Sequence, residues 1–136
     1  MGTAISDYTI GSEAIFAPDY IFNATAMPNN DNTSSGFFKF GKNQSGTELI
    51  IVADAETVVA ATKTLTFELL QDVSETGDYT TSKTLATYPA ATYAAGTEFV
   101  RFVASDDILQ FCKVKVTTTD DLSGKTITGY LRYISR

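Results

Sequence analysis

Residues 64–69 read Thr-Leu-Thr-Phe-Glu-Leu and residues 112–117 read Cys-Lys-Val-Lys-Val-Thr, so both stretches alternate polar with apolar side chains. Successive side chains of a β-strand point to opposite faces, and this alternation is typical of a strand with one face in a core and one in water. The same parity extends to the closing strand of the chain. The predicted core residues are Leu65, Phe67, Leu69, Val114, Val116 and Leu131.

Short apolar runs of the same kind recur along the chain, separated by turn-forming residues. Together with the two stretches above, they predict about eight strands, at residues 20–25, 37–40, 48–53, 64–70, 83–88, 98–103, 109–118 and 127–133. The run at 48–53 is apolar on successive positions, which is typical of a strand covered on both faces. Residues 27–36 combine almost every turn-forming residue type and are predicted to be a long exposed loop.

The number of strands and the unequal lengths of the loops favour an all-β fold, a single-domain antiparallel β-sandwich that is jelly-roll-like. This sandwich is predicted to occupy residues 20–136, and the connection at 53–62 is long enough to cross from one sheet to the other. Residues 1–19 have mixed character and no clean period. They are predicted to be an N-terminal arm or an irregular first element.

Five apolar or aromatic side chains are candidates for contacts with another protein chain. Three lie in the arm, where a free tail would leave them exposed to water, and a fourth follows the arm directly. The fifth comes from residues 37–40, which place rings on both faces of one short strand, so that at least one ring is expected to meet something other than a single core. The candidate interface residues are Ile10, Ile15, Phe16, Tyr20 and Phe38.

The composition excludes several classes of partner. The formal net charge is −6 and no run of Lys or Arg is visible, so the average surface repels a nucleic-acid backbone. No apolar stretch approaches the roughly 20 residues of a membrane-spanning helix, and residues 1–7 carry no basic segment of a signal peptide. A single cysteine cannot form an internal disulfide and is compatible with a reducing cytoplasm. We therefore expect a soluble protein that binds neither nucleic acid nor membrane.

The residue types that build most catalytic and zinc sites are scarce. The chain has no histidine and one cysteine, Cys112, which we expect to be a small core residue. The paired carboxylates lie in turns, at Asp106-Asp107 and Asp120-Asp121, where Asp is a common turn former. No spacing matches a calcium loop or a phosphate-binding glycine loop. We expect a protein that works by contact and is not an enzyme, with no metal and no cofactor.

The order of elements resembles that of the Bbp16-like capsid cement proteins, small jelly-roll proteins that decorate the heads of tailed bacteriophages. The similarity spans residues 20–135 and rests on a pattern of strands, whereas the arm, the loop at 27–35 and the stretch at 78–94 depart from it. An Ala-Gly turn at residues 95–96 precedes a strand-turn-strand ending. The similar segments are Gly36-Phe37-Phe38-Lys39-Phe40-Gly41, Thr47-Glu48-Leu49-Ile50-Ile51-Val52, Thr64 to Asp72 with Gln71 near its end, Phe111 to Val116, and Gly124 to Gly129.

The resemblance implies a non-enzymatic homotrimer on the outer capsid surface of a virion, made in the host cytoplasm, that holds neighbouring subunits of the major capsid protein together. Two alternatives stay open. A carbohydrate-binding β-sandwich of a tail or secreted protein would use Tyr8, Tyr20, Tyr79, Tyr88 or Tyr93 as stacking platforms, although tryptophan, usually the best platform, is absent. A calcium-stabilised or weakly catalytic jelly roll is the third hypothesis.

Overall fold

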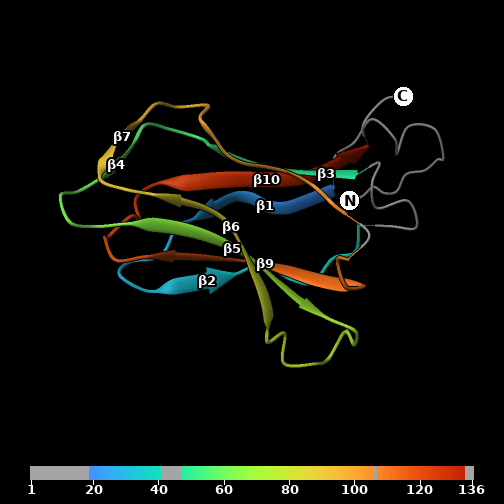
Figure 1. Ribbon diagram of the computed structural model, residues 1–136. Helices are drawn as coiled ribbons and strands as arrows, with labels where there is room; N and C mark the ends of the chain where they lie inside the picture. The colour runs from blue at the N-terminus through green and yellow to red at the C-terminus, as the bar shows by residue number, and fades with distance from the viewer. Residues whose placement is uncertain (1–18, 41–46, 106, 134–136) are drawn as a thin grey trace.

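The computed structural model describes residues 19–40, 47–105 and 107–133, which form ten strands and no helix. Two four-stranded sheets lie face to face, and a small two-stranded sheet lies at one end (Figure 1). The predicted all-β antiparallel sandwich is confirmed. The strands are β1 (Asp19–Ala26), β2 (Asn32–Ser34), β3 (Thr47–Ala53), β4 (Thr57–Val59), β5 (Leu65–Asp72), β6 (Thr81–Tyr88), β7 (Ala91–Tyr93), β8 (Glu98–Val103), β9 (Phe111–Thr118) and β10 (Thr126–Tyr133).

The strands pair from the two ends of the described chain inward. β1 pairs with β10, β2 with β9, β3 with β8, β4 with β7 and β5 with β6, all antiparallel. Further pairing of β10 with β3 and of β9 with β5 completes the two large sheets, with the orders β1-β10-β3-β8 and β2-β9-β5-β6. The described chain is therefore folded like one long hairpin. Apart from β4 and β7, its successive strand pairs belong alternately to one large sheet and to the other.

The core between the sheets has the parity that the sequence predicts. Every second side chain of β5 and β9 is buried. All six predicted core residues are buried, and the most exposed of them, Leu131, is 8% exposed. The ring of Phe67 stacks on that of Phe99 with centroids 5.4 Å apart, so one aromatic contact joins the two sheets. Cys112 is also in the core, as predicted, and burial raises the pKa of its thiol to about 12.

β3 is covered on both faces, as its unbroken apolar run predicts. Leu49 and Ile51 belong to the core between the sheets, whereas Ile50 points to the other side of its sheet. Ile50 is nevertheless completely buried. The neighbours of β3 are β10 and β8, so it lies inside its sheet and has no free edge.

Residues 27–36 are mostly exposed, as their composition predicts, but they are not one continuous loop. They contain β2, which pairs with β9, and Met27 is 2% exposed within the core cluster. Ser35 is also buried: its hydroxyl oxygen accepts a hydrogen bond from the N–H of Val114 at 3.0 Å. The reason is tertiary, because the edge of β9 offers backbone groups that need partners, and this requirement outweighs low local strand propensity.

Residues 37–40 do not form the predicted strand. They make one isolated bridge, in which the N–H and C=O groups of Phe38 and Cys112 exchange hydrogen bonds of 2.8 Å. Phe38 and Phe40 both enter the core, where their rings meet edge to face with centroids 5.5 Å apart. Phe37 points outward and is 44% exposed. Burial still alternates along this segment, because Phe38 and Phe40 are buried whereas Phe37 and Lys39 are exposed, so its parity is that of a strand although the ladder is missing.

The loop between β5 and β6 is organised around Asp72, the last residue of β5. Its carboxylate accepts hydrogen bonds of 3.0 Å from the backbone N–H groups of Ser74 and Tyr79, which hold the pKa of Asp72 below its usual range. Tyr79 adopts a left-handed φ of 53°, is 5% exposed, and donates its hydroxyl hydrogen to the carbonyl of Glu75. This loop projects away from the sandwich in Figure 1, where it is yellow-green.

We expect Gly77→Ala to destabilise the protein by about 1 to 3 kcal/mol, because the added methyl group forces its surroundings to move. A Cβ atom at this position would overlap the carboxylate of Asp72, which two hydrogen bonds hold in place. Urea denaturation measures the change in the free energy of unfolding. Gly124→Ala is the matched control, because an added Cβ there meets no atom within 4 Å. Equal losses for the two variants would contradict this role of Gly77.

Candidate functional site

The structure separates the five candidate interface residues. Ile10, Ile15 and Phe16 lie outside the described residues. Tyr20 is on β1 and is 54% exposed, so its ring is available to a partner. Phe38 lies in the core, so that the ring which residues 37–40 offer to a partner belongs to Phe37 and not to Phe38.

Tyr20 opens a row of side chains that crosses the outer face of the sheet β1-β10-β3-β8. Tyr20 is opposite Tyr130, Tyr130 is opposite Ile50, and Ile50 is opposite Arg101. The two tyrosine rings meet edge to face with centroids 6.5 Å apart. This face therefore presents an aromatic edge on β1 and β10, a buried Ile50 in the middle and a cation on β8.

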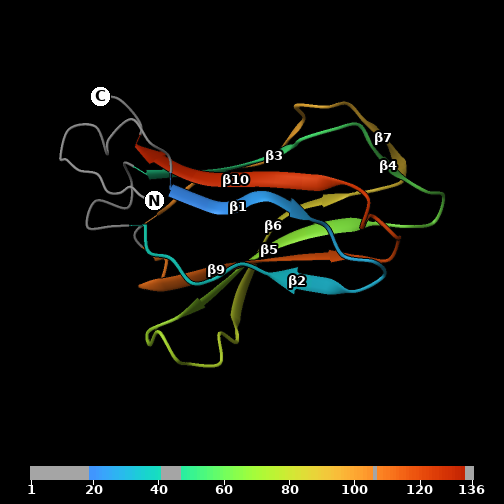
Figure 2. The ribbon, with the colours of Figure 1, turned by 180° about the vertical axis from the view of Figure 1, so that it is seen from behind.

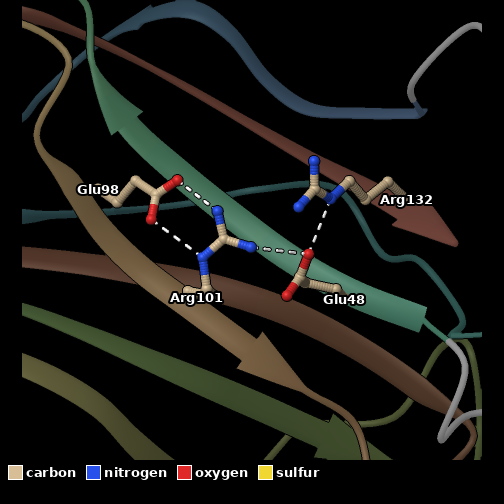
Figure 3. Close-up of polar contacts among 4 residues, drawn as sticks. All are labelled: Glu48, Glu98, Arg101 and Arg132. Carbon is tan, nitrogen blue, oxygen red and sulfur yellow. Dashed lines mark hydrogen bonds and ion pairs between the residues drawn. The ribbon is translucent and has the colours of Figure 1, made fainter. Parts of the chain in front are cut away.

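An ionic network lies beside this row on the same face (Figure 3). Glu48 uses its Oε1 atom for two contacts. This oxygen accepts a hydrogen bond from Arg132 Nε at 2.8 Å and forms an ion pair with Arg101 Nη1 at 2.9 Å. Arg101 also holds Glu98 through two hydrogen bonds, of 3.0 Å from Nε and 2.5 Å from Nη2. The Glu48 side chain is 8% exposed, whereas the two arginine side chains are 43% and 50% exposed.

We define the tyrosine–arginine face by Tyr20, Tyr130, Arg101 and Arg132, with Ile50 and Glu48 beneath them. Burial alone would raise the pKa of Glu48, but hydrogen bonds and positive charge from Arg132 and Arg101 outweigh it and hold that pKa below its usual range. Tyrosine and arginine are the residue types that carry most of the binding energy at protein interfaces. The fixed guanidinium groups make this face suited to binding.

We expect the stability of the protein to fall as the pH drops through about 4.5 and below. A group whose pKa is lower in the folded than in the unfolded state stabilises the fold above its unfolded pKa, and this contribution is lost as the pH falls through the folded pKa. The pKa values of Glu48, Glu98, Asp72 and Asp121 are all lowered from usual values of 4.5 for Glu and 3.8 for Asp.

Glu48 is buried, and Glu48→Gln tests how much its ionised carboxylate contributes to the free energy of unfolding. We expect a loss of about 1 to 2 kcal/mol at pH 7, because charged hydrogen bonds disappear but the arginines stay half exposed to water. At pH 3 the variant and the unchanged protein should differ much less. Urea denaturation at both pH values makes the comparison, with the exposed Glu56→Gln as control. A loss that is the same at pH 3 and pH 7 would contradict the assignment.

The tyrosines considered as sugar-stacking platforms are mostly engaged in the fold. The hydroxyl groups of Tyr79, Tyr88 and Tyr93 each donate a hydrogen bond to a backbone carbonyl. Tyr88 and Tyr93 also pack edge to face with centroids 5.2 Å apart. Tyr8 lies outside the described residues, which leaves Tyr20 as the exposed candidate among those described.

The carboxylates of the turn at Asp120-Asp121 accept backbone and hydroxyl hydrogen bonds. Asp121 Oδ1 accepts from the backbone and hydroxyl of Ser123 at 3.1 and 2.6 Å, as expected of a turn former. Asp120 Oδ1 accepts from the N–H of Asp121 at 2.8 Å, and its Oδ2 accepts at 2.9 Å from the N–H of Ala60, which is distant in the chain. Asp106 lies outside the described residues. Among the residues that the structure describes, no three side chains of His, Cys, Asp or Glu gather in a group that could hold a metal ion.

Two features of the surface were not apparent from the sequence. One is the network around Glu48, for which the available signal is a carboxylate inside an otherwise apolar strand, a position that requires a charged partner. The other is a set of lysines that are distant in the chain. Lys39 Nζ lies 5.0 Å from the ring centroid of Phe111, and Lys113 Nζ lies 4.5 Å from that of Tyr79. A search of the sequence for runs of Lys or Arg therefore misses lysines that only the fold brings together.

Comparison with known proteins gives no significant match to a family model, to a curated protein or to a solved structure. The part of the chain that the structure describes contains no helix long and apolar enough to cross a membrane. The functional interpretation therefore rests on the geometry of the surface and on the resemblance drawn from the strand pattern.

Proposed function

We propose that the protein is a capsid cement protein: a non-enzymatic structural protein that assembles as a homotrimer on the outer capsid surface of a tailed bacteriophage and binds the major capsid protein. The observation that carries this proposal is the tyrosine–arginine face, a preorganised binding surface beside the first described residues of the chain. Tyr20, at its edge, comes shortly after Ile10, Ile15 and Phe16, three of the other candidate interface residues.

The connectivity of the strands supports the jelly-roll part of the proposal. A jelly roll has eight strands in two sheets that arise from two Greek keys, so that its strands pair from the ends of the chain inward. Once β4 and β7 are set aside, the remaining eight strands have this nested pairing and are divided equally between two sheets. The cement proteins that the sequence resembles are jelly rolls of similar strand order.

The mechanism of a cement protein requires contact and no bond-breaking chemistry. A trimer engages several capsid subunits at once, and each further contact forms at a high effective concentration because the first contact is already made. Several weak contacts then resist separation of the lattice together. The arginines of the tyrosine–arginine face are held in position by Glu48 and Glu98, so little side-chain entropy is lost when they bind.

The carbohydrate-binding alternative is supported among the described residues by Tyr20 alone, since the other described tyrosines that it would use donate their hydroxyl groups to the backbone. The ring of Tyr20 also meets Tyr130 at an interplanar angle of 74°, so the pair forms no flat platform on which a sugar ring would stack.

Native mass spectrometry and co-sedimentation test the proposal. The purified protein should have the mass of three copies, and it should sediment at fixed stoichiometry with capsids assembled from the major capsid protein encoded with it. Tyr20→Ser combined with Arg132→Ser should weaken this attachment at least tenfold, whereas the exposed Val58→Ser on β4 should not. A monomer at every concentration and on every lattice would overturn the proposal, and specific binding on a glycan array would favour the alternative.

A further inference from the structure

A second organised surface lies on the other sheet, where the segment after β2 runs beside β9 (Figure 2). We define the lysine–phenylalanine surface by Phe37, Lys39, Phe111 and Lys113. Phe111 and Lys113 are two residues apart on β9, and their side chains point away from the core that holds Cys112 and Val114. The bridge between Phe38 and Cys112 fixes the other two residues next to them.

The centre of this surface is aromatic and accessible. Phe37 is 44% exposed, and its ring meets that of Phe111 edge to face with centroids 5.8 Å apart. On the adjacent strand Leu70, opposite Lys113, is half-buried, and Val73, just beyond the end of β5, is 71% exposed. An exposed ring supported by a second ring is the kind of anchor that dominates protein interfaces.

Two ammonium groups are held at this surface by aromatic rings. Lys39 lies over Phe111 and Lys113 lies over Tyr79, with nitrogen-to-centroid distances of 5.0 and 4.5 Å. Such contacts attract a cation to the ring face without neutralising its charge. Tyr79 is itself fixed by the hydrogen bonds of the loop between β5 and β6, so Lys113 has a rigid support.

Neither lysine of this surface belongs to an ion pair among the described residues. All three ion pairs among the described residues belong to arginines. Asp72 is opposite Phe111, but its carboxylate accepts hydrogen bonds from two backbone N–H groups of its own loop. Glu68 is opposite Lys115, one step farther along β9. Burial and the negative charge of Asp72 and Glu75 raise the pKa of Tyr79, the ring that supports Lys113, but neither carboxylate forms an ion pair with that lysine. The surface thus combines exposed aromatic rings with two ammonium groups outside the ion pairs of the described residues, on a chain whose net charge is −6.

We propose that the lysine–phenylalanine surface docks an acidic segment of a partner protein, with its carboxylates on Lys39 and Lys113 and an apolar side chain against Phe37. Opposite charge favours the approach of such a segment and fixes its orientation, while the ring provides apolar contact area. The inference goes beyond the proposed cement function and does not depend on it, because it is carried by a different sheet and by different residues.

A nucleic acid fits this surface less well. A phosphate backbone extends well beyond two lysines, and outside the surface it would meet a chain that is acidic overall. The two arginines among the described residues, Arg101 and Arg132, could bind phosphates with two hydrogen bonds each, but they are on the other sheet and are already paired with carboxylates.

Calorimetric titration with synthetic peptides tests the inference. The probe is an acetylated peptide of about eight residues with alternating Glu and a central Phe, compared with the same peptide carrying Gln in place of Glu and with an oligothymidine. We expect binding of the acidic peptide that weakens with salt, and weaker binding of the neutral peptide. The double variant Lys39→Glu/Lys113→Glu should lose at least tenfold in affinity, and Phe37→Ser should lose affinity as well.

The double variant Lys63→Glu/Lys125→Glu is the matched control, because it changes the net charge equally at residues outside the surface and should change affinity less than twofold. Lys39→Gln/Lys113→Gln should give an intermediate loss and guards against misfolding of the charge-reversed protein, which amide NMR spectra monitor. Equal losses in both charge-reversed variants, equal binding of the neutral peptide, tighter binding of oligothymidine, or no binding at millimolar peptide would each overturn the inference.

Discussion

Phe67→Ala is expected to destabilise the protein by about 3 to 5 kcal/mol, the largest effect of any single substitution considered. Phe67 on β5 is completely buried, stacks on Phe99 from the opposite sheet and meets Tyr88 edge to face. Truncation removes a ring from the core between the two described sheets, and the neighbouring rings cannot collapse into the space without disturbing strand pairing. Urea denaturation followed by circular dichroism gives the free energy of unfolding.

The control for this experiment is Val73→Ala, which removes apolar atoms from a side chain that is 71% exposed. Its effect should stay within about 0.5 kcal/mol, as is usual for surface substitutions. Phe67→Leu should fall between the two, because it keeps part of the buried volume. A change below about 0.5 kcal/mol for Phe67→Ala would show that the parity assigned to β5 is wrong.

The parts of the fold that the sequence predicts are those whose pattern is local. β5 and β9 alternate with period two over eight residues each, and β3 is apolar throughout, so each stretch indicates both its conformation and its degree of burial. No partner strand has to be known for such an inference. The two faces of β5 and β9 and the inside position of β3 follow from these patterns.

The elements that sequence reasoning missed are those whose reason lies elsewhere in the chain. β2, β4 and β7 have three residues each, too few to show a period, and each exists because it completes the pairing of a strand far away. The same limit explains residues 37–40, where the burial of Phe38 and the exposure of Phe37 follow from one bridge to Cys112. Composition contains no information about that bridge.

The candidate surfaces were predictable to different degrees for the same reason. Tyr20 follows from its place beside the arm, which is a local feature. The network of Glu48, Arg101 and Arg132 depends on the register of β3 between β8 and β10, and the pairing of Lys39 with Phe111 depends on a contact between distant segments. A charged residue in an apolar strand indicates that a partner exists, but its identity requires the register.

Deletion of residues 1–16 is expected to abolish attachment to capsids while leaving the sandwich folded. β1 begins at Asp19, so every strand that the structure describes is retained. The deleted segment contains Ile10, Ile15 and Phe16, three of the candidate interface residues. Specific interfaces bury about 1,200 to 2,000 Å² in total, and a few apolar or aromatic anchors carry most of their energy, so the loss of three anchors should remove detectable binding.

Co-sedimentation with capsids assembled from the major capsid protein encoded with the chain measures attachment, and urea denaturation measures folding of the same sample. A full-length variant with Ser at positions 10, 15 and 16 separates loss of anchors from loss of chain length, and it should detach as completely as the deletion does. The midpoint of unfolding should stay close to that of the unchanged protein in both, since both keep every core residue that the structure describes. If the shortened protein still decorates capsids with unchanged occupancy, the arm is not the anchor, and the tyrosine–arginine face must supply the contact through Tyr20 and its arginines without it.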